Sequence, residues 1–173
     1  MISVKRLLSF KSNQTPTPKF KIFCDMDGVI ADFESQFKTL TGMVSHDFEE
    51  KYSTNEFWNV IHKEGSKFWS LIPKTPQMDE LWNYIKPHKP SLLSAPSTQL
   101  SSRVGKQEWV NTHIPNTELI MVPAKEKKNY AAPNHILIDD MEKNIKEWKE
   151  AGGIGILHES TDQTIKELTN LGL

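Results

Sequence analysis

The chain has 173 residues, of which 37% are hydrophobic and 25% charged, so it is long enough for one globular core with a small additional element. Its formal net charge of −1 excludes a basic field over the whole molecule of the kind that binds long nucleic acids. The single cysteine, Cys24, excludes an intrachain disulfide and a zinc site built on several cysteines. We expect Cys24 to be a buried strand thiol.

Residues 1–19 are expected to form an N-terminal extension. They contain basic residues, serines and threonines but no acid, which is loosely the composition of an organelle transit peptide. The alternative is a flexible extension, because residues 12–18 combine prolines with polar side chains that bury little. The sequence contains no run of about eighteen apolar residues, the length needed to span a bilayer. We therefore expect a cytoplasmic protein without a membrane partner, with organelle targeting as the alternative.

An apolar segment at residues 21–24 runs directly into Asp25 and Asp27, which are separated by one residue and followed by Gly28. A buried strand holds such carboxylates rigidly at the crevice where open α/β sheets bind ligands, and glycine permits a sharp turn there. Apolar residues at helical spacing then predict a helix over residues 30–40.

Residues 41–85 lack a strand pattern and are rich in aromatic residues. Helical pieces are expected at residues 47–52, 54–62 and 78–84, separated by polar turns. We interpret residues 41–85 as a small helical cap inserted after the first strand and helix.

Strands alternate with helices in the remainder of the chain. The apolar runs predict strands at residues 91–94, 118–122, 135–138 and 154–157, with helices at residues 99–113 and 142–149 between them. Such alternation implies right-handed crossovers and a parallel sheet. We therefore predict an α/β fold with a Rossmann-like parallel sheet flanked by helices, whose core comprises residues 20–40 and 86–173.

Two of the predicted strands end in paired carboxylates, Asp25 with Asp27 and Asp139 with Asp140. In a parallel sheet both pairs emerge at the same edge, where four acids repel one another unless a cation neutralises them. Oxygen ligands favour Mg²⁺ over zinc. One pair alone could simply cap the following helix, but two pairs flanking the expected crevice favour the metal site.

The segment Asp25-Met26-Asp27-Gly28-Val29 resembles the first motif of the haloacid dehalogenase-like (HAD) phosphohydrolases, and Ile136-Leu137-Ile138-Asp139-Asp140 resembles their fourth. The continuation Ile30-Ala31-Asp32-Phe33, the short cap and the Asp-Asp pair resemble the 5'(3')-deoxyribonucleotidases and their bacterial and phage relatives. The resemblance covers roughly residues 20 to 158, nearly the whole chain apart from its ends.

This resemblance implies a role for each acid. Asp25 is expected to be the nucleophile that forms an aspartyl-phosphate, and Asp27 the general acid and base. Mg²⁺ would be held by the Asp25 carboxylate, the Asp27 backbone carbonyl and Asp139. Asp140 would bind the ion through water or support another ligand.

The resemblance also implies phosphate-binding residues. The Ser94 hydroxyl and the Ala95 amide match the second motif. Lysines at positions 125, 127 and 128 are candidates for the third, and we favour Lys127 and then Lys125 because Tyr130 follows closely.

Five aromatic residues lie in or beside the predicted cap: Phe33, Phe57, Trp58, Phe68 and Trp69. At least three are expected to form the cap's own core, while Phe33 and Trp69 are the better candidates for stacking on a substrate base. On the helix after Ser94, Lys106 could face a phosphate, but we favour a solvated side chain.

The predicted function is Mg²⁺-dependent hydrolysis of nucleoside monophosphates, small-molecule substrates, and in particular of 5'(3')-deoxyribonucleotides. Two alternatives stay open: a 3'-phosphatase that acts on nucleic-acid ends, and a non-catalytic binding module with the same fold. The sequence does not decide the oligomeric state and leaves a homodimer open.

Overall fold

The computed structural model, which describes residues 20–173, is built around a five-stranded parallel sheet. The strand order is β3-β2-β1-β4-β5, and every pairing is parallel. The strands are β1 (Lys21–Cys24), β2 (Ser91–Ser94), β3 (Leu119–Met121), β4 (His135–Asp139) and β5 (Ile154–Leu157). The predicted parallel α/β fold is thus confirmed. The predictions for residues 1–19 lie outside the described residues.

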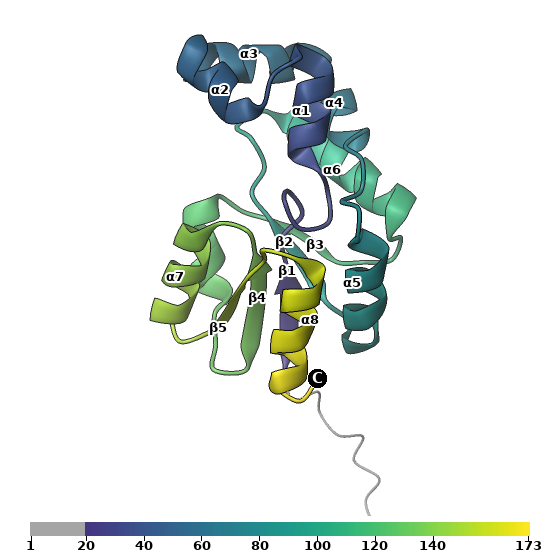
Figure 1. Cartoon of the computed structure of the whole chain (residues 1–173), viewed down its shortest axis with the longest axis vertical. Helices are drawn as coiled ribbons and strands as arrows, with labels where there is room; N and C mark the ends of the chain where they lie inside the picture. Colours follow the sequence, from purple (N-terminus) through teal and green to yellow (C-terminus); the bar gives the residue numbers. More distant parts are fainter. Residues whose placement is uncertain (1–19) are drawn as a thin grey trace, which may run out of the picture.

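Helices cover both faces of the sheet because side chains alternate along each strand. Ile22 and Ile136 pack into a core cluster with α5, α6 and α8, whereas Phe23 and Leu137 pack with α7 on the other face (Figure 1). The α-helices are α1 (Phe33–Thr41), α2 (Ser45–Lys51), α3 (Thr54–Glu64), α4 (Ser66–Ser70), α5 (Met78–Ile85), α6 (Leu100–His113), α7 (Glu142–Glu150) and α8 (Thr161–Asn170). Two 3₁₀ segments, η1 (Lys86–His88) and η2 (Ala124–Tyr130), complete the structure.

Helices α1 to α4 form an upper lobe above the carboxyl ends of the strands (Figure 1). This lobe is joined to α6 by close packing, since a Cβ on Gly105 would overlap the carbonyl oxygen of Ser66 and lie 2.6 Å from Cβ of Trp69. The Trp109 indole N–H also donates a 2.7 Å hydrogen bond to the carbonyl of Ile72. Helix α6 therefore anchors the lobe to the sheet.

The helix after β1 begins later than predicted. Residues 26–31 form a tight loop instead, in which the amides of Val29, Ile30 and Ala31 all donate to the Met26 carbonyl. Asp32 then caps α1 by accepting a 3.0 Å hydrogen bond from the Ser35 amide. The apolar residues at the start of the predicted helix therefore line a turn rather than a helix face.

Two helices were missing from the sequence prediction. Helix α4 has only five residues, too few for a periodic pattern, and α8 follows the last predicted strand. Helix α5, predicted within the cap, packs beside α8, where the Tyr84 hydroxyl donates a 2.9 Å hydrogen bond to the Leu173 carbonyl. The division of the chain at residues 40 and 86 stays a prediction. None of the helices in residues 20–173 is long and apolar enough to cross a membrane.

We expect Gly105→Ala to destabilise the protein although alanine favours a helix. The alanine gains about 1 kcal/mol in helix propensity, whereas overpacking a filled interface costs about 1–3 kcal/mol. Because the overlap involves the backbone oxygen of Ser66, α4 must move, and we expect a net loss of about 1 kcal/mol in the free energy of unfolding. Urea denaturation measures this loss. The exposed Glu108→Ala on the same helix is the control, and equal stability of the two variants would contradict the prediction.

Candidate active site

The carboxylates predicted at the strand ends meet at one edge of the sheet. Strands β1 and β4 are neighbours with Cys24 beside Ile138, and the Asp25 amide donates a 2.8 Å hydrogen bond to the Ile138 carbonyl. Asp25 and Asp139 therefore emerge side by side at the point where the strand order reverses. Below them, the Cys24 thiol is fully buried, as predicted, and burial raises its pKa, so it is held as an unreactive thiol.

Lys127 is the lysine that η2 places between these two acids. Its ammonium lies 3.0 Å from Oδ2 of Asp25 and 2.7 Å from Oδ2 of Asp139, and its side chain is 2% exposed. Burial alone would lower the pKa of Lys127, but the two carboxylates raise it above its ordinary value, so the amine stays charged. Lys125, the other predicted candidate, is exposed.

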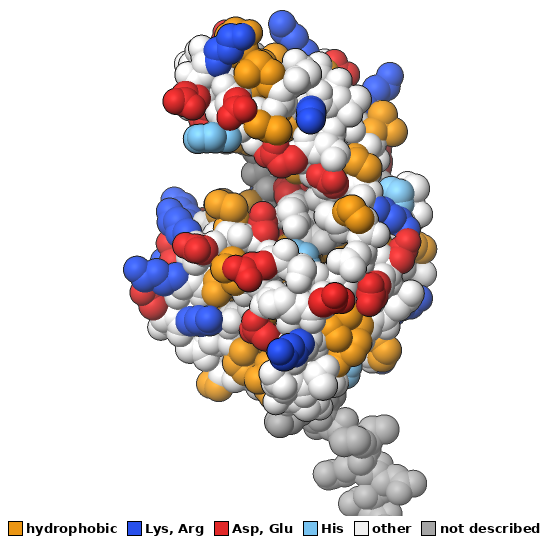
Figure 2. Space-filling view, in the orientation of Figure 1, with side chains coloured by type: hydrophobic (Ala, Val, Ile, Leu, Met, Phe, Trp, Pro, Cys, Tyr) orange, Lys and Arg blue, Asp and Glu red, His pale blue; other side chains and the backbone are white. Residues whose placement is uncertain are grey.

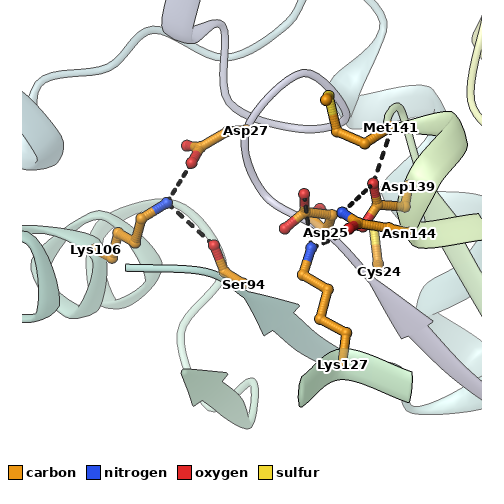
Figure 3. Close-up of polar contacts among 9 residues, drawn as sticks. All are labelled: Cys24, Asp25, Asp27, Ser94, Lys106, Lys127, Asp139, Met141 and Asn144. Atoms are coloured by element: carbon orange, nitrogen blue, oxygen red, sulfur yellow. Dashed lines mark hydrogen bonds and ion pairs between the residues drawn. The ribbon is translucent and has the colours of Figure 1, made fainter. Parts of the chain in front are cut away.

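Asp139 is held in place by three groups in addition to its strand. It accepts hydrogen bonds from Lys127, from the Met141 amide at 2.9 Å and from the Asn144 side chain at 3.0 Å (Figure 3). Burial and the neighbouring Asp25 raise its pKa, while Lys127 opposes that shift. Asn144 was not predicted from the sequence. Its position four residues after Asp140, in the first turn of the following helix, was a signal that it lies near the acids.

The residues present fit a hard divalent cation. Carboxylate oxygens of Asp25, Asp139 and Asp140 lie within 4.8 Å of one another, and Oδ1 of Asp25 is buried without a hydrogen-bond partner among residues 20–173. Gly28, at φ +75°, leaves the space that Asp140 occupies, because a Cβ there would overlap its carboxylate. Such an all-oxygen donor set is the one that Mg²⁺ prefers.

The third acid of this cluster, Asp140, has a pKa near neutrality. Burial, together with the charges of Asp25 and Asp139, raises the pKa of Asp140 to about 7. A cation bound to this cluster would favour the ionised carboxylate and would therefore compete with this proton.

Asp27 is separated from the other three acids. Its carboxylate turns toward α6, where Oδ2 lies 2.5 Å from the Lys106 ammonium, and that ammonium also donates a 3.0 Å hydrogen bond to the Ser94 hydroxyl (Figure 3). Burial raises the pKa of Asp27, and Lys106 only partly opposes the shift. The prediction of a solvated Lys106 is wrong, because its side chain is 0% exposed.

The helical pattern of α6 contained the signal for Lys106. Its buried positions are Ser102, Gly105, Lys106, Trp109 and Val110, which recur at the spacing of one helix face. A lysine on the same stripe as Trp109 is therefore directed inward, and burying its charge requires a partner.

A cavity of about 1120 Å³ opens over the acids, between the upper lobe and the sheet. Figure 2 shows the molecule hollowed between these two parts. Asp25, Asp27, Lys127 and Asp140 line its floor, together with Ala95 and the hydroxyl-bearing Ser97 and Thr98, which the sequence analysis did not single out. Ser94 itself is fully buried beneath this surface.

The opposite wall of the cavity is aromatic. Phe33, Phe57, Trp58 and Trp69 line it. Phe57, Phe68 and Trp69 are buried in the core that the lobe shares with one face of the sheet, so three of the five rings are core residues, and Trp69, one of the two predicted stacking residues, is among them. Phe33 packs at 5.5 Å against Phe68 and at 6.0 Å against Trp69. Both predicted stacking residues thus lie at the cavity, supported from behind by other rings.

No protein-family model matches the chain, and no curated protein matches its sequence. Its structure is similar to a HAD-superfamily hydrolase from Ehrlichia chaffeensis, with a TM-score of 0.59 and 9% identity over 90% of this chain and 98% of that one. A hydrolase from Streptococcus pneumoniae gives a TM-score of 0.55 and 14% identity over 88% and 100% of the two chains. A predicted phosphatase from Clostridium acetobutylicum gives 0.51 and 14% over 87% and 98%. At these identities the similarity shows the fold, which is HAD-like.

We expect Asp140→Asn to change how stability depends on pH in protein kept free of metal with a chelator. The pKa of Asp140 is about 7 in the folded protein and 3.8 in the reference state, so the folded state binds the extra proton between these values. The stabilisation that protonated Asp140 contributes is fully present below pH 4 and is lost as the pH rises through 7. Between pH 4 and pH 8 the free energy of unfolding should therefore fall by about 1–2 kcal/mol less in the variant than in the wild type, after allowance for solvent screening.

Urea denaturation at pH 4, 6 and 8 measures this difference, with the exposed Glu108→Gln as the control. Parallel pH profiles for wild type and Asp140→Asn would contradict the raised pKa.

Proposed function

We propose that the protein is a Mg²⁺-dependent phosphomonoesterase that hydrolyses nucleoside monophosphates, in particular 5'(3')-deoxyribonucleotides. The observation that carries the proposal is the pairing of Asp25 with the buried Lys127, within a cluster of carboxylates on the floor of a cavity that has an aromatic wall. The HAD-like fold supports the same class of reaction by analogy.

The first chemical step forms a phosphoenzyme. The charge of Lys127 attracts the phosphate, and its ion pair with Asp25 holds that carboxylate in place as the nucleophile. A carboxylate oxygen of Asp25 forms a bond to phosphorus as the bond from phosphorus to the ester oxygen breaks. The leaving oxygen takes a proton from Asp27, whose raised pKa favours the protonated form that this step requires.

The second step returns the enzyme to its initial state. The Asp27 carboxylate accepts a proton from a water molecule as that water attacks phosphorus. The bond from phosphorus to Asp25 then breaks, and inorganic phosphate leaves. The Ser94 hydroxyl and the Ala95 amide are assigned to the phosphoryl oxygens in both steps, since Ala95 lines the cavity and Ser94 lies directly beneath it.

The Asp25, Asp139 and Asp140 carboxylates would hold Mg²⁺, with the Asp27 backbone carbonyl as a further ligand. The ion would shield the nucleophile from the negative charge of the phosphate and orient the phosphate for attack.

The aromatic wall suits a planar leaving group. Phe33 and Trp69 are assigned to stacking on the base, since one aromatic face accommodates several bases. A cavity of about 1120 Å³ has room for a mononucleotide. The exposed Lys125 and Lys128 near the rim favour, as a second candidate, the phosphorylated 3' end of a nucleic acid.

A panel of phosphomonoesters tests the substrate class. We expect nucleoside 5'- and 3'-monophosphates to be hydrolysed faster than sugar phosphates with Mg²⁺ present, and activity to fall at least about 100-fold with chelator, because the metal stabilises the charge at phosphorus. Phosphate release measures both. Preferential hydrolysis of 3'-phosphorylated oligonucleotides, with a steep loss of activity as salt rises, would favour the second candidate. No hydrolysis of any substrate would favour a binding module.

Substitution of the two aspartates tests their different roles. Asp25→Asn should abolish turnover, because the amide is not a nucleophile. Asp27→Asn, given an aryl phosphate whose leaving group needs no proton, should accumulate a phosphoenzyme that hydrolyses about 100-fold more slowly than in wild type. Intact-protein mass spectrometry detects the added phosphoryl group. If Asp25→Asn kept most of the activity, the nucleophile would be another residue.

A further inference from the structure

Lys106 is a second buried lysine beside the site, and the reaction described above assigns it no role. It lies on the inward face of α6, and its side chain is 0% exposed. Burying an ammonium group without partners costs far more free energy than the packing of one side chain contributes. Its partners therefore determine why a lysine occupies this position.

Three groups surround the Lys106 ammonium. It lies 2.5 Å from Oδ2 of Asp27 on the loop after β1, 3.0 Å from the hydroxyl of Ser94 at the end of β2, and 5.0 Å from the ring centroid of Trp69 in α4 (Figure 3 shows the first two). Each of the three has a part in the proposed reaction as acid, phosphate ligand or stacking residue. The Lys106 side chain thus contacts one residue with each of these three parts.

The position of Lys106 is itself rigid. The neighbouring Gly105 permits α4 to pack directly on α6, and Trp109, one turn further along, is hydrogen-bonded to the Ile72 carbonyl at 2.7 Å. The ammonium is therefore held at a fixed place between the upper lobe and the sheet, which is a requirement for a group that orients others.

Hydrogen-bond chemistry then fixes the orientation of two side chains. An ammonium only donates, so the Ser94 oxygen must accept from it, and the hydroxyl hydrogen of Ser94 is left to donate elsewhere. In the same way Oδ2 of Asp27 accepts from Lys106, whereas Oδ1 is buried and without a hydrogen-bond partner among residues 20–173. Lys106 thus fixes the position of the Asp27 carboxyl group through one of its oxygens and the direction of the Ser94 hydroxyl.

We propose that Lys106 is a positioning residue: through Oδ2 it holds the Asp27 carboxyl group in the orientation from which it acts as the acid, and by donating to the Ser94 oxygen it leaves the Ser94 hydroxyl hydrogen to donate to the phosphoryl group. The inference rests on the proposed phosphomonoesterase function. It also explains why the two acids of the first motif behave differently, because Lys127 holds Asp25 and Lys106 draws Asp27 away from the other three carboxylates.

The test compares Lys106→Met on two phosphomonoesters, using the full chain with Mg²⁺. An alkyl phosphate requires a proton on its leaving oxygen, whereas p-nitrophenyl phosphate does not. We expect the rate of leaving-group release in the first turnover to fall about 100-fold for the alkyl ester and less than about 10-fold for the aryl ester, since positioned proton transfer contributes about 10²–10⁴-fold. The same change at an exposed lysine of α8, Lys166→Met, should leave both rates unchanged.

Lys106→Gln supplies the second variant and the measurement if the methionine variant does not fold. Its amide can still donate to Asp27, so its alkyl-ester rate should lie between those of the wild type and Lys106→Met, and its loss should again be greater for the alkyl than for the aryl ester. Equal losses on both esters in a folded variant would show a merely structural lysine and overturn the proposal. A wild-type protein inactive on all phosphomonoesters would instead overturn the proposed function, and this inference with it.

Discussion

The structure depends on two buried lysines that pair with three of the four acids at the carboxyl ends of β1 and β4. Without compensation, acids gathered at the carboxyl ends of β1 and β4 would oppose folding through mutual repulsion and loss of hydration. Lys127 pairs with Asp25 and Asp139, and Lys106 pairs with Asp27. The fourth acid, Asp140, forms no ion pair with a lysine among residues 20–173, and burial together with the charges of Asp25 and Asp139 raises its pKa to about 7. The negative carboxylate charge that the two lysines do not neutralise would suit a divalent cation.

The two lysines also connect the site to different parts of the fold. Lys127 comes from η2, which packs with α7 on one face of the sheet. Lys106 comes from α6 on the other face, which also carries the upper lobe through Gly105 and Trp109. Packing of the lobe and orientation of Asp27 are thus properties of one helix. A change in the contact between α4 and α6 would therefore alter the position of Asp27 through Lys106.

The cavity unites two surfaces that serve different purposes. Its floor is made by strand ends and carries the charges, an arrangement that follows from the parallel sheet. Its wall is made by aromatic residues of the upper lobe, such as Phe33 and Trp69. Similarity of fold does not identify the substrate, because the same fold carries many functions. Under the proposed function, the leaving group would contact the aromatic wall.

The sequence by itself determined the parallel α/β fold, the strand ends that carry Asp25 and Asp139, and the burial of Cys24, because period-two and helical patterns and strand-end acids are local features. The sequence favoured Lys127 within a run of lysines, but only the structure showed which amine reaches the acids. Tertiary structure alone decided which groups Lys106 and Asn144 contact, the delayed start of α1 and the separation of Asp27 from its neighbours. Each depends on contacts between segments far apart in the chain or on a loop closing upon itself, which local periodicity does not encode.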